Sequence, residues 1–321
     1  MSQDSIYNPL VSIIVPSYNQ GKFIKETIDS VLSQDYRPIE LLVIDGCSTD
    51  TTVNVLESFG YSAELKWISE PDNGVTDAVN KGLARAGGEI LAIQSSDDVY
   101  LPGAISAAVD FMRGHNDVAL VYGDVELINE HSEVIGNDIL PPFTFKEYVG
   151  RFTYIPQPAT FFRAEFAREI EGWRKEMSYA ADADYWMRIA VKHKVVKLDK
   201  LMARYRYHPE QRDRNSGSIA RDWEKTIHDL LTHSNLDTET KRFARMGLHL
   251  AKYRYTPETS WLERSWYLYR AFFSNPLAVT DRRFPKREFV IGREPIWRFF
   301  SRVKRLLGLK PRGMTNSCHI R

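Results

Sequence analysis

The sequence predicts an α/β fold, in which one mostly parallel, Rossmann-like sheet is flanked by helices and followed by a helical C-terminal extension. Two observations lead to this fold class. Short apolar, β-branched segments such as "LVSIIVP" (10–16) are typical of strands covered on both faces. Between these segments, apolar residues recur at helical spacing. Strands and helices therefore alternate along the chain, as they do in a parallel sheet with helices on both faces.

Each element follows from its own pattern. The turn "SYNQG" after the first strand leads into a helix whose apolar residues are three or four positions apart, and "IELLVID" (39–45) then repeats the buried-strand pattern. These three segments form one strand-helix-strand unit. The pattern continues with a helix over 51–58, a strand over 65–69, a helix over 75–86, a strand over 89–94, a helix that begins after Pro102 and a strand over 118–123.

The second half of the chain is less regular. Residues 124–160 are rich in proline and aromatic residues, and we expect loops and short strands there, packed over the site. A helix is expected over 182–193, followed by the strand-like segments "VVKLD" and "LMARYRYH". We place the domain boundary near residue 215. A first domain then comprises residues 1–215, and a helical, basic and aromatic extension comprises 216–321.

Composition narrows the class of protein. The 321 residues carry 43 Lys and Arg against 42 Asp and Glu, a net charge of +1, so no global field would attract nucleic acid. The two cysteines lie at opposite ends of the chain, which argues against a disulfide framework and favours a reducing cytoplasm. Cys47 is expected to pack as a small buried side chain. Because no segment resembles a signal peptide or a membrane-spanning helix, we expect a soluble or peripheral protein.

Acidic residues follow three of the predicted strands: Asp45, the Asp97–Asp98 pair and Asp124. We expect them to share the edge of the sheet at which α/β folds bind their ligands. Taken alone, Asp124 or Asp50 is more simply a turn or helix-capping residue. Two adjacent carboxylates, however, are costly to bury unless a cation lies between them, and such oxygen ligands favour Mg²⁺ or Mn²⁺.

The first strand-to-helix turn excludes two common nucleotide sites. "PSYNQGKF" contains a single glycine, so it matches neither the G-x-G-x-x-G turn of dinucleotide-binding folds nor the phosphate-binding P-loop. A sheet with this acidic edge more plausibly holds a diphosphate through a metal ion.

Several motifs, in the right order, carry a resemblance to a known family. They are "VSIIVPSYNQGKFIKETIDSVLSQ", "IELLVIDGCSTDTT", "EPDNGVTDAVNKGLARAGGEIL", "SSDDVYLPGA", "ADADYWMRIA" and "YRYHP". Over residues 10–215 the sequence resembles the inverting nucleotide-sugar glycosyltransferases of family 2, which have the GT-A fold. The resemblance implies a UDP- or dTDP-sugar donor, a divalent metal (Mn²⁺ or Mg²⁺) and an acceptor hydroxyl. It makes residues 1–215 the catalytic domain.

By this resemblance, Pro16 and Tyr18 border the nucleotide base and Asp45 accepts a hydrogen bond from it. A second segment, over residues 77–82, flanks the nucleotide and the sugar. Asp97 lies near the ribose, and Arg206 could pair with the diphosphate. Tyr18 could equally be an ordinary half-buried aromatic residue, and the basic side chains could simply be solvated. The residues of the second segment are Asp77, Asn80, Lys81 and Gly82.

The metal would be held by Asp98, which matches the last acid of the family's D-x-D element. Ser96 stands at the first acidic position of that element, so the number of protein carboxylates is low. His208 matches a position near the metal or the phosphate, although a lone histidine at the end of a strand is often just a surface residue.

Transfer with inversion is a single displacement, and a base must therefore stand on the acceptor side. Asp182 matches the family's base, with Ala181 where a Glu is common, and its alternative role is a helix N-cap. Asp184 is expected to orient a neighbouring group or the acceptor. Gln157 is a candidate partner of the acceptor hydroxyl, with loop packing as the alternative.

Residues 294–308 form a possible membrane-associating helix. Apolar and aromatic residues share one face of it and basic residues lie elsewhere around it, as in helices that lie in a lipid headgroup region. The alternative is that the apolar face packs on the catalytic domain.

The leading hypothesis is an inverting, metal-dependent glycosyltransferase of cell-surface polysaccharide or lipopolysaccharide synthesis, acting on a saccharide or lipid-linked acceptor. One alternative is a sugar-nucleotide pyrophosphorylase, which would need a glycine-rich, basic loop after the first strand. Another is a catalytically silent scaffold at the inner face of the membrane, against which the presence of Asp98 and Asp182 speaks.

Overall fold

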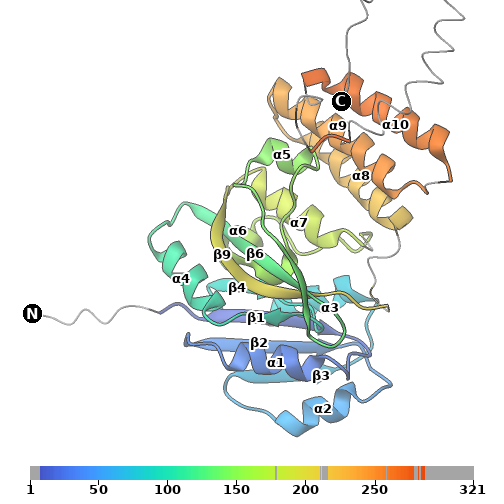
Figure 1. The fold of residues 1–321 in the computed structure, drawn as a ribbon. Coiled ribbons are helices and arrows are strands. Elements are labelled where there is room, and N and C mark those ends of the chain that lie inside the picture. The colour runs from blue at the N-terminus through green and yellow to red at the C-terminus, as the bar shows by residue number, and fades with distance from the viewer. Residues whose placement is uncertain are drawn as a thin grey trace, which may run out of the picture.

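The computed structural model describes residues 8–177, 179–209, 211, 216–257, 259–277, 281 and 283–285. Within these residues, the strands form one sheet in the order β3-β2-β1-β4-β8-β6-β9-β5, with β7 paired to β6 (Figure 1). The strands are β1 (Val11–Ser17), β2 (Ile39–Asp45), β3 (Leu65–Ser69), β4 (Ile90–Ile93), β5 (Val99–Tyr100), β6 (Val118–Ile128), β7 (Val134–Asp138), β8 (Thr160–Arg163) and β9 (Lys194–Arg206).

Helices cover both faces of this sheet. One face carries α1, α2 and α4, and the other carries α3, α6 and α7 together with α8. The helices are α1 (Ile24–Leu32), α2 (Thr52–Phe59), α3 (Val75–Arg85), α4 (Ala104–Arg113), α5 (Phe145–Val149), α6 (Ala164–Arg168), α7 (Ala181–Ala190), α8 (Ser216–His233), α9 (Thr238–Tyr255) and α10 (Trp261–Ser274); a 3₁₀ turn, η1, spans Gln157–Ala159.

The N-terminal half of the sheet is parallel and buried, as predicted. β1 pairs with β2 and β4, and β2 pairs with β3, all in parallel register. Every residue of β1 and β2 is buried, which explains why their sequences are apolar without alternation. α3 packs so closely on β1 that a Cβ added at Gly82 would overlap the side chain of Ile14. The mostly parallel α/β fold with flanking helices is therefore confirmed.

The other half of the sheet contains more strand than the loops and short strands expected over 124–160. β6 continues to Ile128 and pairs with β7, while β8 lies between β4 and β6 and runs antiparallel to both. Asp124 consequently lies inside a strand and not at its exit. Its carboxylate accepts hydrogen bonds from the amide of Leu140 and from Nζ of Lys197 (2.8 Å). These contacts support its alternative role as a structural residue, while the strand register places Asp124 level with Ser95, at the edge of the sheet that follows β4.

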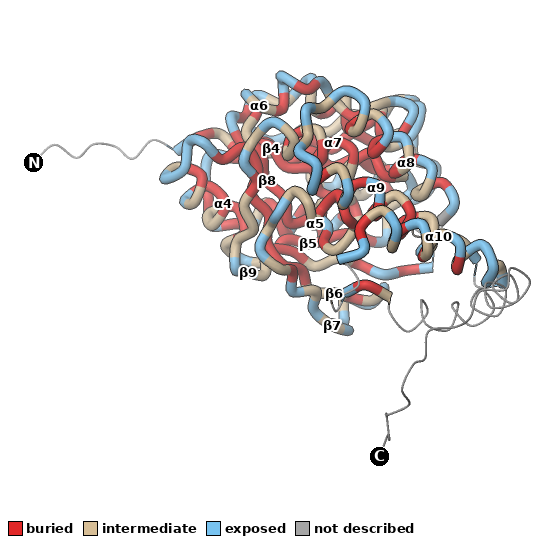
Figure 2. Tube along the Cα trace, turned by 90° about the horizontal axis from the view of Figure 1, so that it is seen from above, coloured by how far each residue is buried: buried red, intermediate tan, exposed pale blue. Residues whose placement is uncertain are grey.

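Packing continues across the predicted domain boundary. Trp223 and Ile227 of α8 are buried in the same apolar cluster as Tyr148 and Trp186. Figure 2 shows buried stretches in the neighbouring helices α7 and α8. Residue 215 lies outside the described residues, so a boundary there stays a prediction. A smaller cluster joins α9 to α10.

Two expectations concerned contact with a membrane, one about spanning helices and one about residues 294–308. None of the helices in the described ranges combines the length and the apolarity that crossing a bilayer requires. Residues 294–308, the predicted amphipathic helix, lie outside the described part of the chain.

Candidate active site

The acidic turn after β4, which contains Asp97 and Asp98, is held in place by hydrogen bonds from α1 and β9. Asp98 is 1% exposed, and its Oδ1 accepts a 2.8 Å hydrogen bond from the backbone amide of Arg206. Oδ2 of Asp98 is buried and has no hydrogen-bond partner within the described residues. Burial, together with the neighbouring charge of Asp97, raises the pKa of the Asp98 carboxyl well above its ordinary value. This buried carboxylate is poised to gain from a cation.

His208 lies beside this turn, as the metal prediction requires. Its Nε2 is 3.0 Å from Oδ2 of Asp97, and its buried ring packs against Phe23 at 5.0 Å between centroids. The structure thus brings Asp97, Asp98 and His208 together from segments that are distant in sequence. The alternative that His208 is merely a surface residue is wrong, because the residue is only 5% exposed.

Arg206 is fully buried and bonded to protein groups. Its guanidinium donates to Oε2 of Glu26 (2.7 Å) and to the backbone carbonyl of Asp97 (2.7 Å), and it lies 4.8 Å from the ring centroid of Phe23. Two further contacts, to the Asn129 carbonyl and the Ser132 hydroxyl, occupy Nη1. This geometry supports a positioning role for Arg206 more directly than contact with a diphosphate, and the solvated alternative is wrong.

Two residues of α1 belong to this site although the sequence did not single them out. Oγ1 of Thr27 donates to the carbonyls of Ser96 and Asp98, and Glu26 pairs with Arg206. Thr27 is a polar residue on the buried face of α1, and that position was the available signal. Glu26 offered no local signal because its partner lies on β9.

The residues predicted to meet the nucleotide lie at the ends of β1 and β2. Pro16 is buried in β1, and Tyr18 is 58% exposed just beyond it. Asp45 is fully buried, and its carboxylate accepts hydrogen bonds from the Ser48 amide and hydroxyl and from the Ser69 hydroxyl. Oδ1 accepts only one of these three bonds, so it retains the capacity to accept a further hydrogen bond.

Cys47, in the turn after β2, corrects an expectation. It is exposed rather than buried, and its φ of 61° lies in the left-handed region that glycine usually occupies. This backbone conformation accounts for the residue's place in a tight turn without any packing by the thiol.

Helix α3 connects the donor-side residues to the loop before α7. Asn80 donates to the carbonyl of Trp173 and accepts from its amide, both at 2.8 Å. Lys81 donates to the Pro71 carbonyl and pairs with Glu70 at 3.1 Å, so it is not simply a solvated side chain. Asp77 caps the turn at the start of α3 by accepting from the Asn73 amide.

Asp182 and Asp184 occupy the first turn of α7 in different environments. Asp182 is partly exposed, whereas Asp184 is fully buried. Asp184 accepts from Nε of Arg188 (2.8 Å) and from the hydroxyl of Thr226, and it contacts Arg174 at 3.3 Å. Of its two predicted roles, the geometry supports the orientation of neighbouring groups.

The turn before α7 is fixed from α8 by a residue that the sequence did not indicate. Oδ2 of Asp222 accepts from the amides of Tyr179 (2.7 Å) and Ala180 (3.1 Å). On the opposite side, the hydroxyl of Thr76 on α3 donates to the Met177 carbonyl. The backbone that carries Asp182 is thus anchored to both α3 and α8.

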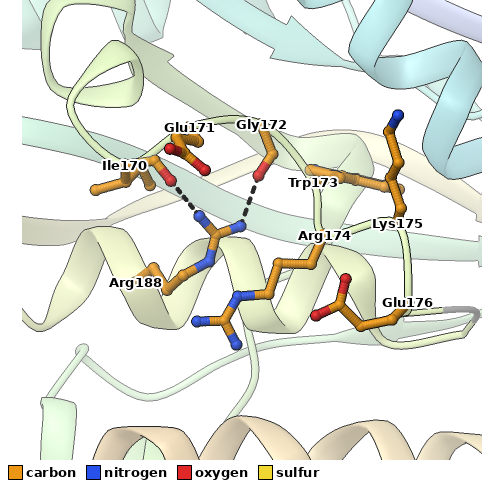
Figure 3. Close-up of a pocket in the computed structure, with 8 residues that line it drawn as sticks. All are labelled: Ile170, Glu171, Gly172, Trp173, Arg174, Lys175, Glu176 and Arg188. Atoms are coloured by element: carbon orange, nitrogen blue, oxygen red, sulfur yellow. Dashed lines mark hydrogen bonds between the residues drawn. The ribbon is translucent and has the colours of Figure 1, made fainter. Parts of the chain in front are cut away.

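A polar pocket of about 490 Å³ lies along the loop between α6 and α7 (Figure 3). Arg188 points into this loop and donates to the carbonyls of Ile170 and Gly172. The pocket contains none of the predicted donor residues. It adjoins the acceptor-side helix because Arg188 also holds Asp184.

Gln157 lies close to the acidic turn. Its Nε2 donates to the hydroxyl of Ser95 (3.3 Å) and to the carbonyl of Ile93 (3.4 Å). These contacts place Gln157 at the exit of β4, where it contributes to loop packing and lies near the predicted reaction centre.

The groups around Asp98 suit a hard cation in part. The unpartnered Oδ2 of Asp98 is a carboxylate oxygen, the ligand that Mg²⁺ and Mn²⁺ prefer, and His208 adds a nitrogen nearby. In the part of the chain that the structure describes, no group of three or more His, Cys, Asp or Glu is arranged to hold a metal ion.

Comparison with known proteins agrees with this arrangement. The family described as "Glycosyl transferase family 2" matches residues 12–166. An uncharacterized glycosyltransferase of Mycobacterium tuberculosis (strain CDC 1551 / Oshkosh) is 32% identical over 192 residues, which cover 57% of this chain and 70% of that protein. The fold is that of the GT-A class of glycosyltransferases. The chain belongs to glycosyltransferase family 2.

Longer relatives match only in part. An uncharacterized glycosyltransferase of Rickettsia felis is 26% identical over 253 residues, which cover 73% of this chain and 41% of that protein. Chondroitin synthase of Escherichia coli is also 26% identical over 253 residues, covering 78% of this chain and 35% of the synthase. The chain therefore spans less than half the length of these relatives.

Solved structures share the fold at low sequence identity. The S. aureus TarS 1-349 complex with UDP-GlcNAc gives a TM-score of 0.66 at 16% identity and covers 94% of this chain and 93% of TarS 1-349. The mannosyltransferase PcManGT of Pyrobaculum calidifontis, in complex with GDP-Man and Mn²⁺, gives a TM-score of 0.61 at 18% identity. The match covers 87% of this chain and 77% of PcManGT.

Proposed function

We propose that the protein is an inverting, metal-dependent glycosyltransferase that moves a sugar from a UDP- or dTDP-sugar to an acceptor hydroxyl in the synthesis of a cell-surface polysaccharide or lipopolysaccharide. The observation that carries the proposal is the buried Asp98 carboxylate, which lies beside Asp97 and His208 and whose Oδ2 has no hydrogen-bond partner among the residues that the structure describes. The similar fold of TarS 1-349 in complex with UDP-GlcNAc supports the donor class, and that of PcManGT in complex with GDP-Man and Mn²⁺ supports the metal.

We propose that Asp98 holds the metal through Oδ2 and that His208 assists it. When bound, a divalent ion supplies positive charge that offsets the charge on the leaving diphosphate. Such ions keep open positions for water and phosphate oxygens, so few protein ligands suffice. Arg206 holds the metal-binding turn in place, because it links the Asp97 carbonyl to Glu26 of α1.

The base is proposed to be Asp182. In the displacement, the acceptor oxygen forms a bond to the anomeric carbon while the bond from that carbon to the diphosphate oxygen breaks. The bonding electrons leave with the nucleoside diphosphate, and the hydroxyl proton passes to the Asp182 carboxylate. The anchors on α3 and α8 fix the backbone on which Asp182 stands, which favours a constant distance between base and donor.

The remaining residue assignments stay proposals. Pro16, Tyr18 and Asp45 would border the base, while Asp97 would lie near the ribose. The α3 residues would flank the nucleotide and sugar, and Gln157 would face the acceptor. The protein is proposed to work in the cytoplasm and to contact the inner face of the membrane through residues 294–308.

A thermal-shift screen of nucleotide sugars tests the function. A donor that binds only the folded state should raise the free energy of unfolding by about 2.7 kcal/mol when its free concentration is 100 times its Kd. We expect one UDP- or dTDP-sugar to raise Tm strongly with Mn²⁺ and weakly without it, and the transferred sugar to show inverted anomeric configuration by NMR. If no nucleotide sugar shifts Tm under either condition, the proposal fails.

A further inference from the structure

Helix α10 carries an apolar face that points away from the protein. Its inner side packs on α9, where Leu268 and Ala271 are buried. On its outer side, Leu262, Trp266 and Phe273 are 63%, 58% and 73% exposed. These three residues are spaced four and seven positions apart and so form one stripe along the helix. A surface helix ordinarily turns polar residues outward, whereas α10 is apolar on two opposite sides.

The stripe runs the length of the helix. Trp261 at its first residue is 50% exposed, and Leu277, just past its end, is 76% exposed. Arg270 is exposed on the neighbouring position of the same side. Figure 1 shows α10 on the outer side of the α8–α10 bundle, at the far end of the molecule from β2 and β3. Several exposed aromatic and aliphatic side chains in one row mark a site of association.

Charge is distributed very unevenly along the chain. Residues 1–215 contain 22 Lys and Arg against 32 Asp and Glu, a net charge of −10, whereas residues 216–321 contain 21 against 10, a net charge of +11. Of this +11, residues 286–321 carry +8, and residues 216–285, which include α10, carry 11 Lys and Arg against 8 Asp and Glu, a net charge of +3. The part of the chain around α10 is therefore positive, in contrast to the negative residues 1–215. Such a charge distribution would orient the protein at a negatively charged surface.

We propose that α10 docks on an anionic lipid surface, with Trp266 and Phe273 entering the headgroup region. Tryptophan and phenylalanine beside arginine are the side chains that suit this boundary, and anionic headgroups complement the positive charge. The two other candidate occupants are less complementary. A second copy would bring the same positive sequence, and residues 286–321 of this chain contain 10 Lys and Arg against 2 Glu.

The test is sedimentation of the full chain with vesicles of phosphatidylcholine alone and of phosphatidylcholine mixed with phosphatidylglycerol. The wild type should pellet with the anionic vesicles, and less so at high salt because screening weakens the attraction. The Trp266→Ser/Phe273→Ser variant should lose about tenfold or more in partitioning. The matched control is Val134→Ser/Ile135→Ser, which removes two exposed apolar side chains of β7 and should bind as the wild type does.

Three results would overturn the inference. Unchanged vesicle binding by Trp266→Ser/Phe273→Ser would exclude α10 as the docking face. A change from dimer to monomer in analytical ultracentrifugation, with vesicle binding unchanged, would show a second copy on the stripe. A large loss of urea stability without loss of vesicle binding would show that the chain's own C-terminal segment covers it.

A Phe299→Ser/Phe300→Ser variant separates this inference from the membrane contact already proposed. If that variant alone loses vesicle binding, residues 294–308 bind lipid and α10 does not. The assay contains neither donor nor acceptor, so its outcome is independent of the transferase proposal.

Discussion

The backbone amide of Arg206 donates a 2.8 Å hydrogen bond to Oδ1 of Asp98, which lies 108 residues earlier in the chain. One oxygen of this carboxylate is thereby fixed by β9, and the other has no hydrogen-bond partner in the described part of the chain. Asp98→Asn keeps an acceptor for Arg206 but removes the charge. We expect it to abolish the Mn²⁺-dependent part of donor stabilisation in the thermal-shift assay. The surface variant Asp110→Asn is the control, and an unchanged Mn²⁺ effect in Asp98→Asn would show that the metal lies elsewhere.

Asp182→Asn should separate binding from chemistry. The donor should still raise Tm, because the variant leaves the turn after β4 intact, while transfer should fall by about a hundredfold or more through loss of the base. Initial rates of nucleoside diphosphate release measure this. Asp199→Asn, whose side chain is 95% exposed, serves as the control. Near-normal turnover would remove Asp182 from the base role.

Arg206→Lys distinguishes positioning from diphosphate binding. Lysine cannot reach Glu26, Asn129 and Asp97 together, so the metal-binding turn should loosen. The Mn²⁺ concentration needed for half-maximal donor stabilisation should then rise by about tenfold. If instead donor binding without metal weakens and the Mn²⁺ requirement stays the same, Arg206 contacts the diphosphate directly.

Asp184→Ala should destabilise the fold. The substitution leaves the guanidinium groups of Arg188 and Arg174 without their buried carboxylate, at a cost of about 3 kcal/mol. Urea unfolding provides the measurement. Asp182→Asn, on the same turn but partly exposed, should change stability little. Equal effects of the two variants would contradict the distinction between them.

Stability should depend on pH through His249 of α9. Burial, followed by the nearby charges of Arg270 and Lys252, lowers the pKa of His249 to about 4. Because this value lies below that of the unfolded chain, the unfolded state takes up the proton first as pH falls. The free energy of unfolding is therefore unaffected by His249 above pH 6.5. It falls by about 3 kcal/mol between pH 6.5 and pH 4, because the unfolded state binds the proton more tightly.

Unfolding of wild type and His249→Gln at pH 7 and pH 4 tests this. The wild type should lose more stability than the variant over this interval, whereas the exposed-site control His233→Gln should follow the wild type. Parallel losses in all three proteins would assign the pH dependence to other groups.

The parallel half of the fold was predictable because a strand that is buried on both faces has a nearly continuous apolar sequence. The segments 39–45 and 65–69 were predicted with the bounds that the structure has. Every residue of the first is buried, whereas the second, at the edge of the sheet, fully buries only Leu65. β8 was not predicted, because its four residues lie directly between the 3₁₀ turn η1 and helix α6 and become a strand only by pairing with β4 and β6.

For the candidate site, the sequence indicated the acidic residues but not the residues whose hydrogen bonds keep them in position. Motif order located Asp98 and Asp182, and the long-range contacts of Thr27, Glu26 and Asp222 had no counterpart in local pattern. The burial of Arg206 was missed for the same reason. A charged residue near a predicted site resembles a ligand-binding group until its partners, distant in sequence, are known.

The position of β8 constrains how the protein can be divided. Thr160–Arg163 lies between β4 and β6, so a fragment that ends before Thr160 would leave two unpaired strand edges in the middle of the sheet. We expect such a fragment to aggregate rather than fold. The two halves of the enzyme should melt as one cooperative unit, and a split version should regain structure only when the piece that supplies this central strand is added back.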